Sequence, residues 1–338
     1  MSNELIRARA PLRLGIAGGG TDVAPYSDEK GGAVLNTTID KFAYCTIRPR
    51  DNDWVTVNSL DYGLVEEWPL DERPLKYGGN FDLIKAVTNH FDIKQGFDMF
   101  IHTDAPVGSG LGGSSTVIVC ILGAMSEWLG VPMTQYEIAH LAYHLEREEL
   151  GLKGGKQDQY AAAFGGFNYI EFKKEDVIVT PLRVRKDILH ELHYSMLLCY
   201  TGKTRESANI IDSQVSNYRN GQNEAALDAA KRLAEEAKDA LLRGEIRRLG
   251  EILNQSWKQK KQFSNSISNE YIDSMYDVAL GNGAIGGKIS GAGGGGFMFF
   301  LCEYDRKHLV ARELGRMGAI TSDFNFEKDG LQTWRHRP

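Results

Sequence analysis

The chain has 338 residues, 42% hydrophobic and 25% charged, a size and composition that allow a large buried core and favour two domains. Its formal net charge is −6, with lysine and arginine spread along the sequence, which argues against general binding to nucleic acid or to an anionic membrane. The four cysteines form no C-x-x-C pair, so we expect neither a zinc site nor a disulfide framework. No apolar run approaches the roughly 18 residues of a membrane span, and none follows the N-terminal arginines as it would in a signal peptide. We therefore expect a protein in the reduced cytoplasm.

The first informative pattern is an alternating strand from residue 5 that ends in the triple glycine 18–20, followed by Thr21 and Asp22. Loops at strand ends are exposed and often carry function, so the polar pair is placed to meet a ligand. An equally good interpretation is that Asp22 caps the next turn. The pattern further predicts strands over 33–47 and 54–57, an irregular stretch over 63–77 and a helix over 81–91.

A glycine-rich turn leads from a predicted strand at 97–102 into an apolar helical pattern at 117–129. Glycines permit close backbone approach, and a helix N-terminus attracts anions, so this turn suits a phosphate. The spacing of Gly108, Gly110 and Gly113 also matches the dinucleotide fingerprint, but no repeated strand–helix units precede it. The hydroxyls that follow could cap the helix, touch a phosphate or bind magnesium: Ser114, Ser115 and Thr116.

A capping box of Thr134 and Glu137 predicts the start of a helix that ends near residue 151. His140 and His144 lie four residues apart on it, but the metalloprotease pattern is absent because leucine follows His140. The acidic run 146–149 has the composition of a solvated helix end. Asp158 lies between two glycine-rich turns, which suggests a carboxylate at a cleft, with an ordinary loop aspartate as the alternative.

The C-terminal half begins with a predicted strand at 193–200 and a turn that carries Lys203 and Arg205. This turn could bind a ligand, or Thr204 could simply cap the helix predicted over 206–215. The glycine run 286–296 is flanked by an apolar strand at 297–301, which favours a packed turn over a linker. Further predictions are an antiparallel helix pair at 223–242 and 245–257, a last helix at 309–317 and a polar end at 327–338.

Three glycine-rich stretches in this order resemble the three motifs of the GHMP kinase family. They are the segment from Pro11 and Arg13 to Asp22, the turn at 106–115, and the run from Lys288 to Gly296, and the resemblance spans residues 9–300. It implies an α+β fold of two domains with ATP between them. Residues 1–190 would form an N-terminal domain like domain 2 of ribosomal protein S5, with the ATP loop and the catalytic residues, and 191–338 a ferredoxin-like C-terminal domain.

The resemblance also implies roles for individual residues. Asp158 matches the catalytic aspartate, with Arg13 as the cation beside it, and Glu146, twelve positions earlier, matches the magnesium-binding glutamate. The metal-bound hydroxyl is that of Ser114 or Ser115, because one extra glycine precedes these serines. Residues implied to bind the sugar are Gly19, Gly20, Thr21 and Asp22. Residues implied to bind ATP are Pro106, Gly108, Ser109, Gly110, Leu111, Gly112, Gly113, Ser114, Ser115, Gly291 and Gly293.

The implied function is that of an ATP- and magnesium-dependent kinase of the anomeric hydroxyl of D-glycero-D-manno-heptose 7-phosphate. The distal phosphate would need cations, for which Lys203 and Arg205 are candidates. The alternatives are another sugar kinase of the fucokinase or galactokinase type, a nicotinamide enzyme, and a non-catalytic regulator, which the presence of Asp158 and Glu146 disfavours. The expected partners are ATP and a sugar phosphate rather than nucleic acid or membrane, and both a monomer and a homodimer remain open.

Overall fold

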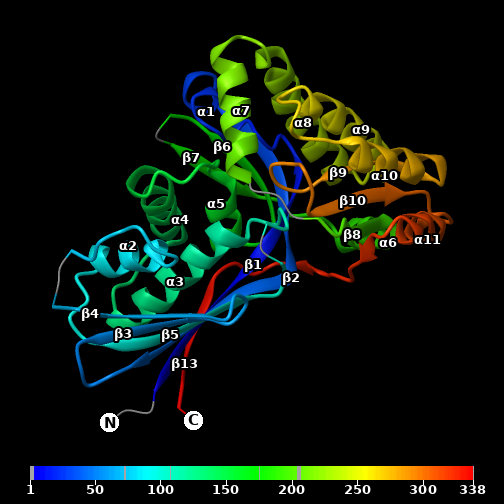
Figure 1. The fold of residues 1–338 in the computed structure, drawn as a ribbon. Helices are drawn as coiled ribbons and strands as arrows, with labels where there is room; N and C mark the ends of the chain where they lie inside the picture. Colours follow the sequence, from blue (N-terminus) through cyan, green and yellow to red (C-terminus); the bar gives the residue numbers. More distant parts are fainter. Residues whose placement is uncertain (1–3, 72–73, 107, 175, 204–206, 338) are drawn as a thin grey trace.

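The computed structural model describes the whole chain except residues 1–3, 72–73, 107, 175, 204–206 and 338. It contains a nine-stranded sheet and a four-stranded sheet (Figure 1). The two ends of the described chain lie close together at one end of the larger sheet (Figure 1), where β1 pairs with β13. In the described part of the chain, no helix has the length and apolar character needed to cross a membrane.

The larger sheet is built around two long strands, β1 (Leu5–Ala17) and β2 (Gly32–Pro49), which pair antiparallel. One path through the sheet runs β13-β1-β2-β5-β3-β4, and β6 and β12 also pair with β2. The β-branched and aromatic residues of β2 favour a strand, and most of them are buried. The other strands are β3 (Trp54–Ser59), β4 (Leu64–Pro69), β5 (Phe97–Thr103), β6 (Phe167–Phe172), β7 (Val177–Pro181), β12 (Phe326–Glu327) and β13 (Gln332–His336).

Helices pack against this sheet and bury their apolar residues with those of β1 and β2 in one core. The apolar helix α3 (Gly113–Leu129) contributes Ile118, Ile121 and Leu122 to that core. The capping box is confirmed: the Glu137 N–H donates to the Thr134 hydroxyl at the start of α4 (Gln135–Tyr143). The remaining segments here are α1 (Tyr26–Glu29), α2 (Asp82–His90), the π-helical η1 (His144–Glu149) and α5 (Gln157–Phe164).

The smaller sheet has the order β11-β8-β10-β9, and its central strand β10 (Phe297–Cys302) is entirely buried. Alternate residues of β10 face two different cores: Phe299 packs with Leu12 and Leu14 of β1, and Phe300 packs with Trp257. The first of these cores therefore joins the two sheets. The other elements are β8 (Met196–Tyr200), β9 (Ala284–Ile289), β11 (Ile320–Thr321), α6 (Lys186–Ser195), α7 (Ser207–Arg219), α8 (Glu224–Arg243), α9 (Ile246–Lys261), α10 (Glu270–Gly281) and α11 (Lys307–Arg316).

The structure differs in detail from several predictions made from the sequence. The stretch 63–77 contains strand β4, and the strand predicted from residue 193 begins only at Met196, because 193–195 end helix α6. The helix predicted over 206–215 continues to Arg219. The polar end of the chain contains β13, which returns to the larger sheet. The domain boundary at 190/191 stays a prediction. It assigns β13 to the C-terminal domain, although β13 pairs with β1 of the larger sheet.

Candidate active site

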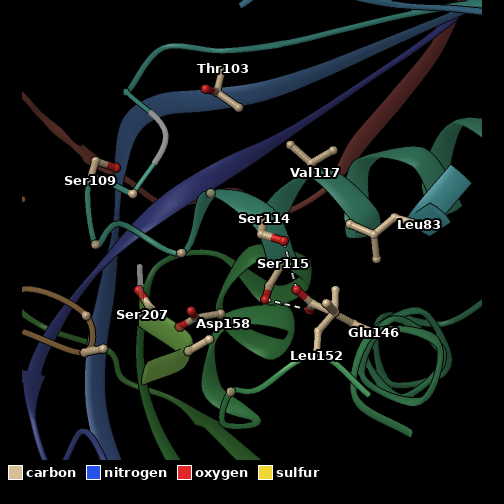
Figure 2. A pocket seen from close by; sticks show the side chains of 18 of the residues that line it. Leu83, Thr103, Ser109, Ser114, Ser115, Val117, Glu146, Leu152, Asp158 and Ser207 are labelled. Atoms are coloured by element: carbon tan, nitrogen blue, oxygen red, sulfur yellow. Dashed lines mark hydrogen bonds between the residues drawn. The ribbon is translucent and has the colours of Figure 1, made fainter. Parts of the chain in front are cut away.

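A cleft of about 620 Å³ lies where the three glycine-rich turns meet. Its walls include the turn before α3, the turn after β1 and Gly291 of the turn between β9 and β10. Figure 2 shows Ser114, Ser115 and Glu146 grouped along it, with Asp158 facing the same space. The structure thus brings together three motifs that are far apart in the sequence.

The turn from β5 to α3 has the backbone geometry expected of a phosphate-binding loop. Gly108, Gly110 and Gly112 have φ of 71°, 80° and 80°, a region that favours glycine. A Cβ on Gly110 would collide with the Ser290 carbonyl oxygen, so this turn packs directly against the third motif. No side chain caps α3 at Gly112, which leaves its N-terminus suited to an anion.

The two serines at the start of α3 bind the same carboxylate. Ser114 Oγ donates to Glu146 Oε1 (3.0 Å) and Ser115 Oγ donates to Glu146 Oε2 (2.7 Å), as the dashed lines in Figure 2 show. Gln159 Nε2 also donates to Glu146 Oε2, at 2.7 Å. Glu146 is only 1% exposed and lies in the π-helical segment η1, a local irregularity that is frequent at functional sites. A solvated end of this helix was therefore the wrong interpretation for Glu146.

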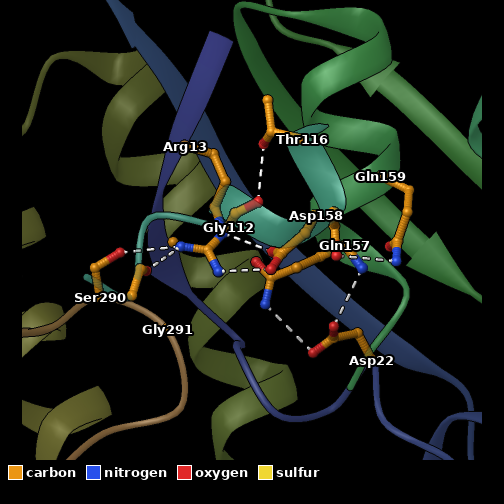
Figure 3. Close-up of polar contacts among 12 residues, drawn as sticks. Arg13, Asp22, Gly112, Thr116, Gln157, Asp158, Gln159, Ser290 and Gly291 are labelled. Atoms are coloured by element: carbon orange, nitrogen blue, oxygen red, sulfur yellow. Dashed lines mark hydrogen bonds and ion pairs between the residues drawn. The ribbon is translucent and has the colours of Figure 1, made fainter. Parts of the chain in front are cut away.

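Arg13 of β1 holds Asp158 of α5 in a two-point ion pair. Arg13 Nε lies 2.7 Å from Asp158 Oδ1 and Nη2 lies 3.0 Å from Oδ2 (Figure 3). The same guanidinium donates through Nη1 to the Gly110 carbonyl (2.6 Å) and to Ser290 Oγ (3.1 Å). One cation thus connects all three motifs with the carboxylate of Asp158.

Asp22 lies at the other end of this polar group and is 2% exposed. Its carboxylate accepts hydrogen bonds from the backbone N–H of Gln157 (3.2 Å) and from Gln157 Nε2 (3.4 Å) (Figure 3). It also accepts one from the backbone N–H of Gly20 (3.0 Å). Asp22 therefore fixes the segment directly before Asp158 and also lines the cleft. The neighbouring Thr21 does not line it: its buried hydroxyl has one hydrogen, and that hydrogen faces the carbonyl oxygens of Gly18 (2.8 Å) and Ala33 (3.0 Å) inside the protein.

Most of the other predicted site residues lie at the cleft. Those that line it are Gly20, Pro106, Gly108, Ser109, Gly110, Gly112, Gly113, Ser114, Ser115 and Gly291. Leu111 belongs to the core, and Gly19 and Gly293 are not part of the lining. Lys203 lies with its ammonium 4.5 Å from the centre of the Tyr271 ring, away from the lining, and Arg205 is outside the described residues. Binding of a phosphate by these two cations stays a prediction.

Lys260 is a cleft residue that the sequence did not reveal. It lies in the last turn of α9, 6% exposed, and its ammonium donates to the Gly291 carbonyl. Burial, together with the charge of Arg13, lowers its pKa to about 8, and Asp22 and Asp158 oppose that shift. In the sequence, Lys260 stands among Lys258 and Lys261, a composition that resembles an ordinary basic helix end.

Lys288, although part of the third motif, does not line the cleft. Its ammonium donates to the Gly15 carbonyl at 2.6 Å, and burial holds its pKa well below the usual value for lysine. Lys288 therefore connects β9 to β1 by a buried hydrogen bond outside the cleft lining.

Comparison with known proteins agrees with this geometry. The family model for the GHMP kinases N terminal domain matches residues 81–166, and the model for GHMP kinases C terminal matches residues 237–320. The D-glycero-alpha-D-manno-heptose 7-phosphate kinase of Campylobacter jejuni is 41% identical over 98% of this chain and 99% of that protein. The chain belongs to the GHMP kinase family. It is an enzyme of the kinase class, which rejects the nicotinamide alternative.

Solved structures of two other kinases have the same fold as this GHMP kinase. A crystal structure of a D-glycero-D-manno-heptose 1-phosphate kinase from Bacteroides thetaiotaomicron superimposes with a TM-score of 0.82 at 40% identity, covering 97% of this chain and 98% of that one. The galactokinase of Lactococcus lactis, at 20% identity over 97% and 95% of the two chains, shares the fold with a TM-score of 0.79. The two-domain α+β fold predicted from the sequence is confirmed.

Proposed function

We propose that this GHMP kinase transfers the γ-phosphoryl group of ATP to the anomeric hydroxyl of D-glycero-D-manno-heptose 7-phosphate, giving ADP and the 1,7-bisphosphate. The observation that carries the proposal is the Asp158 carboxylate, which Arg13 holds beside a turn suited to phosphate. The names of two relatives with 41% and 40% identity support a heptose phosphate as substrate. Those names place the phosphate differently, one at position 7 and the other at position 1.

The chemistry requires an aligned acceptor and stabilisation of charge. Asp158 accepts a hydrogen bond from the anomeric hydroxyl and takes its proton as the bond from that oxygen to the γ-phosphorus forms. The bond from the γ-phosphorus to the bridging oxygen breaks, and ADP leaves with the electron pair. The two donors of Arg13 fix the carboxylate in one orientation during this step.

The nucleotide phosphates lie, in this proposal, over the glycine turn and the N-terminus of α3. Backbone N–H groups there stabilise negative charge without having to reorganise. Because no side chain caps α3 at Gly112, this end of the helix is free to face an anion. The packing of Gly110 against the Ser290 carbonyl supports the turn from the C-terminal side.

Magnesium fits the residues at the start of α3. The Glu146 carboxylate and the Ser114 hydroxyl supply hard oxygen donors, and a magnesium ion in such sites commonly has few protein ligands besides substrate phosphates and water. Among the described residues, no group of three or more His, Cys, Asp or Glu could hold a metal. When bound, the ion neutralises charge on the triphosphate. Of the two serines, we propose Ser114, because it is exposed to the cleft and Ser115 is buried.

The sugar lies, in this proposal, on the side of the cleft formed by Gly20 and Asp22. Lys203 and Arg205 stay candidates for its distal phosphate, although Lys203 does not line the cleft and Arg205 is outside the described residues. Asp22 offers a carboxylate to sugar hydroxyls, and Gly20 allows close approach of the backbone.

A reduced, cytoplasmic setting agrees with four cysteines that are all free and buried.

A substrate panel tests this function. ADP release is measured with D-glycero-D-manno-heptose 7-phosphate, the unphosphorylated heptose, fucose, galactose and mevalonate, with and without magnesium, and the product is examined by ³¹P NMR. The proposal predicts the highest kcat/KM for the heptose phosphate and a new phosphate on carbon 1. Turnover confined to sugars without a distal phosphate would reject the substrate, and turnover of fucose or galactose alone would support the alternative sugar kinases.

A further inference from the structure

Arg13, the cation beside the catalytic carboxylate, has little capacity left to bind a substrate. A guanidinium has five N–H donors, and the structure assigns four of them to Asp158, Gly110 and Ser290. The group can therefore orient Asp158, but it has only one donor left for the oxygens of a phosphoryl group in transfer. A further cation with free donors at this point of the cleft would add to that contact.

Lys260 is such a cation. Its ammonium has three donors, and the described residues supply one acceptor, the Gly291 carbonyl. Gly291 packs against Gly110 of the turn from β5 to α3, so Lys260 Nζ lies beside the junction of the second and third motifs. It also lies 3.9 Å from the position that a Cβ on Gly19 would occupy, at the edge of the first motif. Lys260 lines the cleft where the three motifs meet, so its remaining N–H donors lie in that cleft.

We propose that Lys260 binds the phosphoryl group as it passes from ATP to the acceptor, and so acts as a catalytic residue of this kinase. Negative charge spreads over the peripheral oxygens of that group in the transition state. A preorganised cation in a dry site stabilises such charge more strongly than it stabilises the ground state. The proposal depends on the kinase activity and not on the identity of the sugar.

The charged groups around Lys260 explain how it can remain a cation in a buried position. Asp158 of α5 and Asp22 of the turn after β1 favour the ammonium, and Arg13 of β1 and burial disfavour it, which leaves its pKa at about 8. Lys288 of β9 is the other cation nearby, and it already donates to the Gly15 carbonyl behind the cleft. The ammonium form is thus present below pH 8 and is lost as the pH rises through 8.

The first test is the pair Lys260→Met and Lys258→Met, assayed with whichever sugar the native enzyme turns over fastest. Lys258 is an exposed lysine two positions away on the same helix and serves as the control. Loss of a preorganised donor to transition-state charge predicts a kcat about 10²- to 10³-fold lower for Lys260→Met, with a much smaller change in the KM for ATP. Lys258→Met should behave as the native enzyme. A kcat within threefold of native in a folded Lys260→Met would overturn the proposal.

The second test is the pH dependence of kcat/KM, which would not change between variants if Lys260 had only a structural role. In the native enzyme kcat/KM should fall as the pH rises through about 8, because this ratio reports groups of the free enzyme. In Lys260→Arg the guanidinium stays charged at all accessible pH values, so this decline should disappear even if the rate is lower. An unchanged decline near pH 8 in Lys260→Arg would contradict the proposal, and this test remains available if Lys260→Met does not fold.

A third measurement needs no sugar substrate. ADP with aluminium fluoride mimics the phosphoryl group in transfer, and such mimics bind much more tightly than ground-state ligands. Lys260→Met should bind magnesium–ADP as the native enzyme does but lose the additional tightening with aluminium fluoride. Failure of the heptose assignment would leave this result intact, whereas equal tightening in both proteins would reject the role of Lys260.

Discussion

Arg13 and Asp158 are 145 positions apart in the sequence, yet they form a two-point ion pair with distances of 2.7 and 3.0 Å. The pair joins the first strand of the larger sheet to the start of α5, and Arg13 also donates to the Gly110 carbonyl of the turn between β5 and α3. The position of the Asp158 carboxylate is therefore set by the same cation that holds this turn.

Replacement of Arg13 by methionine should destabilise the protein and reduce the rate. Removal of one partner from a buried pair costs roughly 3 kcal/mol or more, because the other charge is left without compensation. Arg13→Lys should cost less, since the charge remains, but it cannot reproduce the two-point contact. Urea unfolding of both variants checks the order, and equal stability of native protein and Arg13→Met would contradict it.

The two serines of α3 should differ in what they affect. Ser115 is buried and contacts Glu146, Gln159 and Arg147, so Ser115→Ala should lower the free energy of unfolding by about 1–2 kcal/mol. Ser114 is exposed and, among the residues that the structure describes, hydrogen-bonds only to Glu146. Ser114→Ala should therefore raise the magnesium concentration for half-maximal rate about tenfold and hardly change stability. Magnesium titrations and thermal unfolding of both variants separate the two roles. The reverse pattern would assign the metal to Ser115.

Gly110 and Gly113 form a matched pair of variants that tests the packing of the turn between β5 and α3. Gly110 has φ of 80°, and a Cβ there would meet the Ser290 carbonyl, so Gly110→Ala should destabilise the protein by about 2 kcal/mol or more. A Cβ on Gly113 would have no heavy atom within 4 Å, so Gly113→Ala should unfold at the native temperature or slightly above it. Comparable losses in both variants would show that this contact is not what stabilises the turn.

The sequence predicts the parts of the fold that carry a strong periodic pattern or specific end signals. The Thr134 capping box, the helices α8 and α9 and the long strand β2 are such parts. The strands β4 and β13 were missed because both lie at sheet edges and are largely exposed, so they show little alternation of apolar and polar residues. Their pairing is a tertiary contact, which a local pattern does not contain.

The sequence predicts cleft residues where the backbone conformation requires glycine. It does not predict a cleft residue whose single side chain extends into the cleft from a helix. The turn around Gly110 was found because its backbone demands glycine. Asp158 was predicted at a cleft from its place between two glycine-rich turns, and it does line the cleft. Glu146 was singled out only by resemblance to the family, since on its own it looked like a solvated residue. Lys260 has no local signal, because only the packing of α9 against Gly291 brings it to the cleft.

The rate of Asp158→Asn tests the central claim most directly. Asparagine keeps the size of the side chain but cannot take the proton of the acceptor, so ADP release with D-glycero-D-manno-heptose 7-phosphate should fall at least about a hundredfold. Asp187→Asn, at an exposed position on α6, is the matched control and should keep the native rate. A folded Asp158→Asn enzyme with a near-native rate would contradict the claim that Asp158 acts on the acceptor hydroxyl.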